Sequence, residues 1–197
     1  MALEREIKLR FDSADEARER ILALGAAPLL GRRLQEDCLF DTEDERLRRQ
    51  RSTLRVPSEG GKSLLTFKGP AIPGLFKIRE EHETVVADGA ALQTILEELG
   101  LHVWFRYEKY REEFSGDDVV IAVDETPVGV FVEIEGGEEA INATARGLGR
   151  TPTDYITDSY RLLFLQHRDA NGLVGADMMF AGSSTEAQGA KVGLTGE

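Results

Sequence analysis

Charged and apolar side chains alternate strictly in several separate segments, and this period of two constrains the fold more than any other feature. In the segment Leu3–Phe11, Glu4, Glu6 and Lys8 would share one face of a β-strand. Ile7 and Leu9 would lie on the opposite face. A surface strand also carries mixed charge to discourage edge pairing, so one such segment alone decides little.

The same alternation recurs along the chain. The further rows that would share a face are Lys77, Arg79, Glu81 and Glu83; Lys109 and Arg111; Glu133 and Glu135; Leu64, Thr66 and Lys68; and Thr53 and Arg55, with Asp124 ending a strand. Their opposite faces carry apolar residues, which we expect to pack against external helices. The charged rows would then point into the interior of a closed sheet.

Two units of similar order make up most of the chain. The first has a strand over 3–11, a helix over 13–24 and strands over 34–41, 52–56 and 62–68. After a Gly- and Pro-containing break over 69–74, the second has a strand over 76–86, a helix over 89–99 and strands over 102–114, 118–124 and 129–135. A repeat of about 75 residues with eight mostly hairpin-linked strands predicts an α+β fold, an eight-stranded antiparallel closed β-barrel with helices packed outside.

Two more helices are expected after the strands, over 138–147 and 154–167. Residues 169–197 are rich in Gly, Ala and Ser and show little periodicity. We therefore expect one domain over 1–168, followed by a flexible or loosely attached C-terminal tail over 169–197.

The interior of such a barrel would hold many ionisable groups of both signs. The carboxylates are Glu4, Glu6, Glu81, Glu83, Asp124, Glu133 and Glu135, and the cations are Lys8, Arg55, Lys68, Lys77, Arg79, Lys109 and Arg111. Buried carboxylates without cations are strongly unfavourable, and their oxygens are the ligands that Mg²⁺ or Mn²⁺ prefers. Converging Arg and Lys side chains suit a polyphosphate. The pattern indicates one or two divalent metals and a phosphate-rich anion.

Overall charge and cysteine content exclude several other classes. The net charge of −12 argues against a nonspecific binder of nucleic acid polymers. The apolar runs are too short to span a bilayer, and Cys38 is the single cysteine, so no intrachain disulfide forms. With no apolar signal-peptide segment at the N-terminus, we expect a cytoplasmic protein that is a monomer or a homodimer.

The ordered set of charged motifs resembles the CYTH superfamily, also called triphosphate tunnel metalloenzymes, from about residue 2 to about residue 167. ExExK at Glu4, Glu6 and Lys8 is weak evidence alone, but the set in order is specific. The other matching motifs are TLRV at 53–56, LTFKGP at 65–70, KIREEHE at 77–83, EKYRE at 108–112, VDETPVGVFVEIEG at 123–136 and SYRLLF at 159–164.

The resemblance implies a tunnel, a triphosphate substrate, dependence on Mg²⁺ or Mn²⁺, and roles for particular residues. The implied metal ligands are Glu4, Glu6, Glu81, Glu83, Asp124, Glu133 and Glu135. The implied phosphate-binding residues are Lys8, Arg55, Lys68, Lys77, Arg79, Lys109 and Arg111, and the implied catalytic residues are Glu4, Glu6, Lys8 and Glu81. Pro57 departs from the family, which often has a second Arg there, so phosphate binding on that strand is weakened unless Arg49 or Arg51 contributes.

Members of the superfamily perform two chemistries, and a third possibility is binding without catalysis. We favour a metal-dependent triphosphatase acting on inorganic triphosphate, thiamine triphosphate or a nucleoside triphosphate, because hydrolysis needs only an oriented water. The alternative is a class IV adenylyl cyclase that converts ATP to cyclic AMP and pyrophosphate, although the sequence shows no purine-specific constellation. A noncatalytic polyphosphate-binding module would not need both acidic rows.

Four other residues have a simpler interpretation. His82 alternates away from its charged neighbours, which favours a packed or surface histidine over a general base. Cys38 lacks a nearby base in the sequence, which favours a small buried thiol over a nucleophile. Trp104 and Tyr107 either stack on a base or thiazole ring or belong to the core, and the core is favoured.

Overall fold

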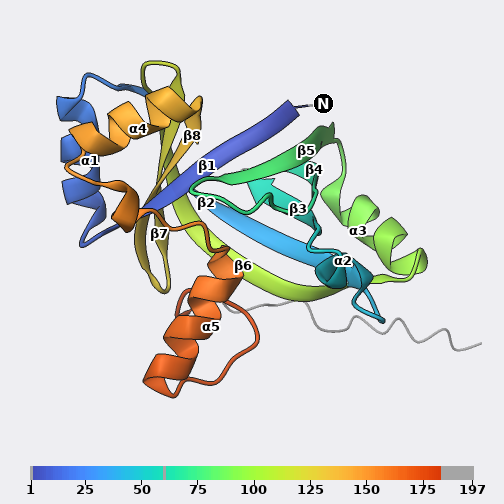
Figure 1. Cartoon of the computed structure of the whole chain (residues 1–197). Coiled ribbons are helices and arrows are strands. Elements are labelled where there is room, and N and C mark those ends of the chain that lie inside the picture. The colour runs from blue at the N-terminus through green and yellow to red at the C-terminus, as the bar shows by residue number, and fades with distance from the viewer. Residues whose placement is uncertain (1, 60, 183–197) are drawn as a thin grey trace, which may run out of the picture.

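Eight antiparallel strands close into a barrel in the computed structural model, which describes residues 2–59 and 61–182 (Figure 1). Around the barrel the order is β1 (Ala2–Phe11), β5 (Lys77–Val86), β4 (Lys62–Lys68), β3 (Thr53–Glu59), β2 (Ala27–Thr42), β6 (Leu101–Ser115), β7 (Val119–Thr126) and β8 (Gly129–Gly136), which returns to β1. Closure leaves an inner and an outer face, so alternate residues of every strand point to opposite sides. The predicted fold class is confirmed.

The two predicted units form the two halves of the barrel. Strands β1 to β4 come from the first unit and β5 to β8 from the second, and the first strands of the units, β1 and β5, pair with each other. The second strands, β2 and β6, pair on the other side of the ring. Side chains from both halves of the sequence therefore face one interior.

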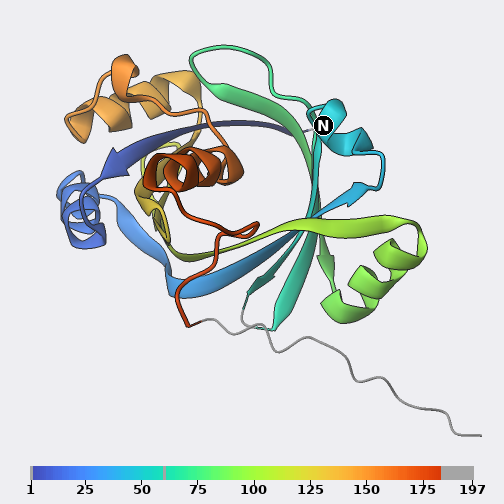
Figure 2. The same ribbon diagram turned by 90° about the horizontal axis from the view of Figure 1, so that it is seen from below.

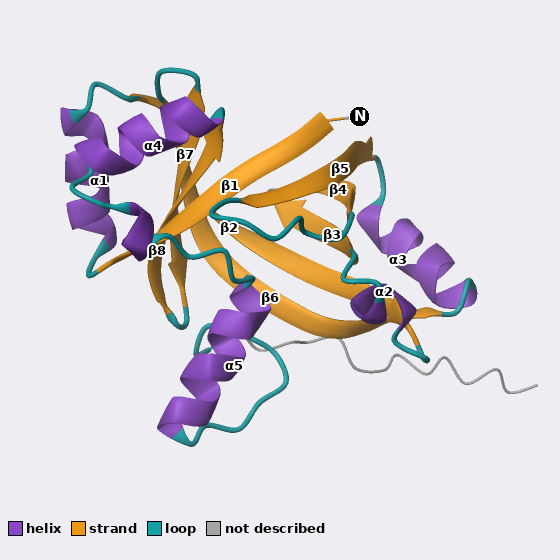
Figure 3. Cartoon of the chain, in the orientation of Figure 1, coloured by secondary structure: helices purple, strands orange, loops and turns teal. Residues whose placement is uncertain are grey.

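Five α-helices surround or cap the barrel (Figure 3). They are α1 (Ala14–Ala23), α2 (Arg46–Arg49), α3 (Gly89–Glu98), α4 (Glu138–Gly147) and α5 (Tyr160–Asn171). The side chain of Ser13 accepts a hydrogen bond from the Glu16 N–H at the start of α1. Gly25 and Gly100 follow α1 and α3 at positive φ, as expected for helix ends. In the described part of the chain, no helix is both long and apolar enough to cross a bilayer.

The apolar outer face of β1 and β8 forms the largest core of the molecule. Ile7 and Leu9 of β1 and Ile134 of β8 are fully buried, and Ile21 of α1 and Ile141 of α4 complete the cluster. Burying one such side chain stabilises the fold by about 1.5–3 kcal/mol. This packing fixes the register of both strands, and a shift by one residue would put the charged row into the core.

Three elements differ most from the predictions. Strand β2 begins at Ala27 rather than at 34, because its first part is exposed, contains bulges and shows no apolar alternation. The short helix α2 was not predicted, and it begins where the Asp41 carboxylate accepts hydrogen bonds from the N–H groups of Leu47 and Arg48. Helix α5 begins at Tyr160 rather than at 154, because Ser159 is its N-cap and residues 152–154 form a separate 3₁₀ turn.

Residues 172–182 return from α5 to the barrel and extend the sheet at β6. The Met178 N–H donates to the Arg106 carbonyl, and the Glu108 N–H donates to the Met178 carbonyl. The Met178 side chain is fully buried. This packing differs from the loose attachment expected for the start of the segment 169–197; residues 183–197 lie outside the described part of the chain.

Candidate functional site: the charged tunnel

The inner face of the barrel encloses a cavity of about 1040 Å³. Each of the seven predicted phosphate-binding residues lines it, together with every predicted carboxylate except Asp124. The residues concerned are Lys8, Arg55, Lys68, Lys77, Arg79, Lys109, Arg111, Glu4, Glu6, Glu81, Glu83, Glu133 and Glu135. The structure thus brings together rows that are far apart in the sequence.

Strand register places opposite charges beside one another. On β1, Glu4 lies opposite Arg79 of β5, and Lys8 lies opposite Glu133 of β8. Glu6 lies between Lys77 of β5 and Glu135 of β8. Directly opposed side chains on one sheet face are close enough to interact, and the register builds the ion pairs Lys8–Glu133 and Lys77–Glu6. Glu4 and Arg79 lie opposite each other but do not form an ion pair.

Lys8 is the centre of one set of ion pairs and is almost completely buried. Its Nζ lies 3.0 Å from Glu6 Oε1 and 3.1 Å from Glu133 Oε1. Burial opposes the charge of this ammonium group, but Glu133 and Glu6 outweigh that effect and raise the pKa of Lys8. Burial likewise favours protonation of Glu6, yet Lys77 and Lys8 hold its pKa below the usual range.

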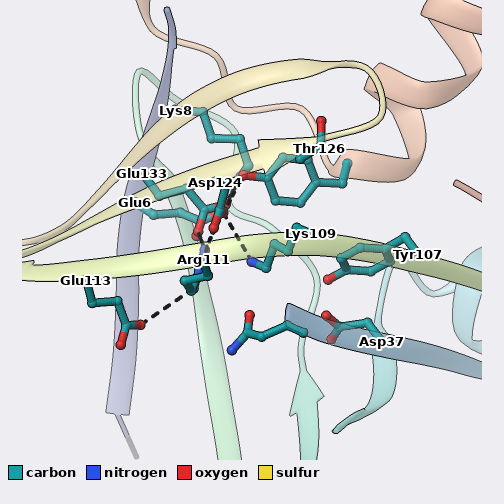
Figure 4. A network of polar contacts seen from close by, with 12 residues as sticks. Glu6, Lys8, Asp37, Tyr107, Lys109, Arg111, Glu113, Asp124, Thr126 and Glu133 are labelled. Carbon is teal, nitrogen blue, oxygen red and sulfur yellow. Dashed lines mark hydrogen bonds and ion pairs between the residues drawn. The ribbon is translucent and has the colours of Figure 1, made fainter. Parts of the chain in front are cut away.

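Arg111 extends these contacts to Asp124 and Glu133 (Figure 4). Its Nε lies 2.7 Å and its Nη2 2.6 Å from the two oxygens of Asp124, a bidentate pair. Lys109 Nζ donates to Asp124 Oδ2 at 3.1 Å. Asp124 is fully buried and lies behind the cavity lining, and Arg111 and Lys109 outweigh burial and lower its pKa.

We use the name paired network for the residues joined by these contacts, Lys8, Lys109, Arg111, Asp124 and Glu133. Each member has at least one partner of opposite charge within it. All five were predicted as site residues, but the sequence did not show that they neutralise one another.

Tyr160, the first residue of α5, joins the paired network from outside the sheet. Its hydroxyl donates to Asp124 Oδ2 at 2.5 Å. The ammonium groups of Lys8 and Lys109 lie 5.2 and 5.1 Å from the centre of its ring, within the range of cation–π attraction. The prediction of the site omitted Tyr160, although the SYRLLF motif contains it. Seen from below, α5 lies in front of the ring of strands, and its first residues line the cavity (Figure 2).

A second group of carboxylates lies farther along β1 and around Glu4. Lys68 Nζ lies 2.5 Å from Glu4 Oε1 and 3.3 Å from Glu81 Oε1. Glu135 is exposed and has no ion pair with any described residue, and partial burial together with the nearby Glu4 raises its pKa to about 7. Burial and Glu6 also raise the pKa of Glu4, against the effect of Lys68. One ammonium group therefore does not neutralise this acidic group of Glu4, Glu81 and Glu135.

Two arginines in the cavity have hydrogen-bond donors without acceptors. The Nε groups of Arg55 and Arg79 are buried and have no partner among the described residues. Arg79 contacts only the Thr53 hydroxyl, at 3.3 Å, and no described carboxylate lies within ion-pair distance of it. Burial lowers the pKa of Arg79, against the attraction of Glu6 and Glu4. A buried cationic N–H group without an acceptor is unfavourable, so these two arginines favour the binding of an anionic ligand.

Arg55 lies on the strand that carries the Pro57 departure. It donates to Asp37 Oδ1 at 3.3 Å and to the Tyr107 hydroxyl at 3.2 Å. Asp37 lies opposite Pro57 and is nearly fully buried. Tyr107 therefore belongs both to the core and to the cavity lining. No sequence pattern indicated Asp37 as a support of the site.

The remaining residues considered in the sequence lie in the cavity, at its edge or outside it. Glu83 is exposed at the rim, where it accepts a hydrogen bond from Thr66. The pKa of Lys77 falls to about 8 because of burial, despite its contact with Glu6. His82 is exposed and stacks on Phe67, and Cys38 is half-buried with a pKa raised by burial.

Comparison with known proteins identifies the family of the chain. The family model of the CYTH domain matches residues 2–160, which is most of the chain. The chain belongs to the CYTH family. Among curated proteins, one from Methanocaldococcus jannaschii named "Putative adenylate cyclase" is 30% identical over 141 residues, which is 71% of this chain and 80% of that protein.

Solved CYTH-like structures share the tunnel architecture. A protein from Vibrio parahaemolyticus superposes with a TM-score of 0.74 at 20% identity, covering 83% of this chain and 98% of that one. HpAC1 from Hippeastrum, whose structure is described as revealing a dominant triphosphatase activity, gives 0.63 at 20% identity, with coverages of 87% and 97%. At these identities the likeness concerns the fold.

CYTH triphosphate tunnel enzymes in general depend on divalent metal ions. The acidic group fits such an ion by its chemistry, because Glu4, Glu81 and Glu135 supply hard oxygen donors whose negative charge Lys68 does not neutralise. Among the described residues no three acidic, His or Cys side chains are arranged to hold a metal, and Lys68 and Lys77 occupy oxygens of Glu4 and Glu6. Metal binding would therefore require these ammonium groups to exchange partners.

Proposed function

We propose that this CYTH protein is a divalent-metal-dependent triphosphatase that hydrolyses a triphosphate inside the charged tunnel. The observation that carries the proposal is that Arg55 and Arg79, each with a buried Nε donor that has no acceptor among the described residues, line the same cavity as the acidic group. Phosphate oxygens would satisfy these donors, and a divalent cation would neutralise the acidic group. A site with both properties suits a metal-bound polyphosphate.

The basic side chains would hold the phosphate chain in one orientation. Arg79 and Arg55 would bind its oxygens directly, since both line the cavity and the Nε group of each has no acceptor among the described residues. Lys8 would contribute fixed positive charge, because Glu133, Glu6 and the Tyr160 ring already hold its ammonium group in place. Pre-positioned charge of this kind stabilises a transition state without reorganisation.

Hydrolysis requires a water molecule to attack the terminal phosphorus while the bond from that phosphorus to the bridging oxygen breaks. Glu4 and Glu135 of the acidic group, together with Glu6, would hold the metal, which when bound neutralises phosphate charge and polarises the phosphoryl group. Glu81 is half-buried, and among the described residues it has an ion pair only with Lys68, so it would accept the proton of the attacking water. The products would be orthophosphate and the shortened phosphate chain.

The adenylyl cyclase alternative rests on the name of the curated relative from Methanocaldococcus jannaschii. Cyclisation would need a seat for adenine so that the ribose 3′-hydroxyl reaches the α-phosphorus. Trp104 is the least buried of the Phe, Tyr and Trp side chains that line the cavity, but two guanidinium groups lie over its ring. This arrangement favours hydrolysis over cyclisation.

Product analysis tests the proposal. The purified protein would be incubated with Mg²⁺ or Mn²⁺ and, separately, inorganic triphosphate, thiamine triphosphate and ATP. We expect orthophosphate from at least one substrate and no cyclic AMP. Glu4→Gln should abolish turnover, and Glu139→Gln on the exposed surface of α4 should not. Cyclic AMP with pyrophosphate, or undiminished turnover by Glu4→Gln, would contradict the proposal.

A further inference from the structure

Three further arginines line the cavity, and two of them lie over the ring of a tryptophan. Arg48 of α2, Arg51 after it and Arg161 of α5 all line the cavity, and we call them the arginine rim. The guanidinium carbons of Arg48 and Arg161 lie 4.3 and 4.6 Å from the centre of the Trp104 ring. The arginine rim therefore contains residues from α2 and α5 that line the same cavity.

Arg48 is the structural member of the rim. Its Nε lies 3.1 Å from Asp41 Oδ2, and its Nη2 lies 3.0 Å from Glu45 Oε1. Two carboxylates thus neutralise its charge and fix the guanidinium group against the Trp104 ring. Arg48 has no need of a further anion.

Arg51 and Arg161 differ from Arg48, because neither has an ion pair with a carboxylate in the described ranges 2–59 and 61–182. Burial lowers the pKa of Arg161, and the nearby charges of Arg48 and Arg168 lower it further. Arg51 holds a left-handed backbone conformation with φ of 58°, and its charge is near enough to lower the pKa of Arg79. Positive charge without a partner therefore continues from Arg79 in the tunnel to the rim.

The continuous positive charge has a consequence for substrate choice. We propose that Arg51 and Arg161 form an anion subsite that continues the triphosphate site and binds the fourth phosphate group of a linear inorganic polyphosphate. This inference rests on the proposed function, because three phosphates must occupy the tunnel before a fourth reaches the rim. The cavity volume of about 1040 Å³ lies at the upper end of the range common for small-molecule sites, so a chain of four phosphates has room.

The same rim would disfavour a cationic group on the third phosphate. The thiazolium ring of thiamine triphosphate carries a positive charge, and it would meet Arg51 and Arg161, neither of which has an ion pair with a described carboxylate. Trp104 could accept that ring only after a guanidinium group moved away. The subsite thus orders the substrates as tetraphosphate, then triphosphate, then thiamine triphosphate.

Binding measured without hydrolysis tests this inference. Titration calorimetry with EDTA present would compare inorganic tetraphosphate and triphosphate on the wild-type protein, Arg51→Gln/Arg161→Gln and Arg168→Gln. Arg168 lies on α5 outside the cavity lining, so its variant controls for the loss of charge on that helix. We expect the double variant to lose about tenfold in affinity for tetraphosphate and less than twofold for triphosphate. Arg168→Gln should change neither.

Two results would overturn the inference: equal affinity of the wild-type protein for both anions, or equal losses for both in the double variant. Thermal unfolding of each variant verifies that the fold is intact, and Arg51→Lys/Arg161→Lys should keep the preference for tetraphosphate. The proposed function fails separately, if the wild-type protein releases no orthophosphate from triphosphate with Mg²⁺ or Mn²⁺. Selective binding of tetraphosphate would persist in that case.

Discussion

The tunnel contains two charged regions that are built in different ways. In the paired network, Lys8, Lys109 and Arg111 each contact Asp124 or Glu133, and Glu6 supplies a third carboxylate beside Lys8. Elsewhere in the same cavity, Arg79 and Glu135 have no ion pair with any described residue. The first region satisfies its own charges, and the second leaves both signs uncompensated.

This difference separates structural charge from charge available to a ligand. A buried ion pair contributes little net stability, but removal of one partner is costly because the other charge is left buried. An unpaired buried charge already carries its desolvation cost in the free protein, so its removal costs little stability. Substitutions in the two regions should therefore affect different measurements.

The largest effect is expected in the paired network. Asp124→Asn should lower the free energy of unfolding by about 3–5 kcal/mol, because Arg111 and Lys109 lose their shared carboxylate. Urea denaturation measures this change. Asp169→Asn, which breaks an exposed pair with Arg168, is the control and should cost at most about 1 kcal/mol. A loss below 1 kcal/mol for Asp124→Asn would remove the distinction between the regions.

Substitution of Arg79 should have the opposite consequence, with a large loss of activity and little loss of stability. Arg79→Gln should lower kcat/KM for inorganic triphosphate by about 10²–10³-fold, because a phosphate-binding donor is lost. Its free energy of unfolding should stay within about 1 kcal/mol of the wild-type value, since no ion pair is broken. Steady-state kinetics and urea denaturation on the same preparation measure both. Arg106→Gln, outside the cavity lining, should leave kcat/KM unchanged.

Tyr160 should show an intermediate effect, because it supports the paired network from α5. Tyr160→Phe removes the hydrogen bond to Asp124 and should lower the free energy of unfolding by about 1.5–3 kcal/mol. It keeps the ring beneath Lys8 and Lys109, so KM should change little. Tyr160→Leu removes the ring as well and should raise KM. Equal KM values for the two variants would show that the ring does not position the lysines.

The smallest effect is expected at Asp41, whose carboxylate holds α2 and Arg48. Burial is outweighed by hydrogen bonds from the Leu47 and Arg48 N–H groups, so the pKa of Asp41 lies below its ordinary value. The Asp41 carboxylate therefore stabilises the folded state fully above the pKa of Asp in the unfolded chain, about 3.9. This stabilisation is lost as the pH falls through the lower pKa that Asp41 has in the folded protein. Asp41→Asn should cost about 1 kcal/mol at pH 7. Unfolding measured down to pH 3 should show this difference shrinking, whereas a constant difference would contradict the assignment.

Much of the fold follows from alternation that is visible in the sequence. The charged rows at Glu4–Lys8 and Lys77–Glu83 predicted which faces point inward, because period-two patterns fix strand sides. Their apolar partners predicted the outer helices. The same rule could not reveal β2 before 34, where both faces are exposed, or α2, which depends on a carboxylate six residues before Leu47.

The site was predicted as a list of residues but not as a set of partners. Alternation places Glu135 and Asp124 in one interior, yet only the register and the depth along the strands decide that Asp124 is paired and Glu135 is not. Tyr160 was missed because its role depends on where α5 begins, and Ser159 sets that boundary as the N-cap. The sequence alone therefore does not show which charged side chains are free to contact a ligand. That depends on the register of the strands in the closed barrel.

The most direct measurement of the central claim is a crystal structure with Mn²⁺ and inorganic triphosphate, using anomalous scattering to locate the metal. We predict that phosphate oxygens contact Arg55 and Arg79 and that Mn²⁺ lies on Glu4 and its acidic neighbours, while the paired network keeps its contacts. Triphosphate bound outside the tunnel, or Mn²⁺ on Asp124 with Arg111 displaced, would contradict the account.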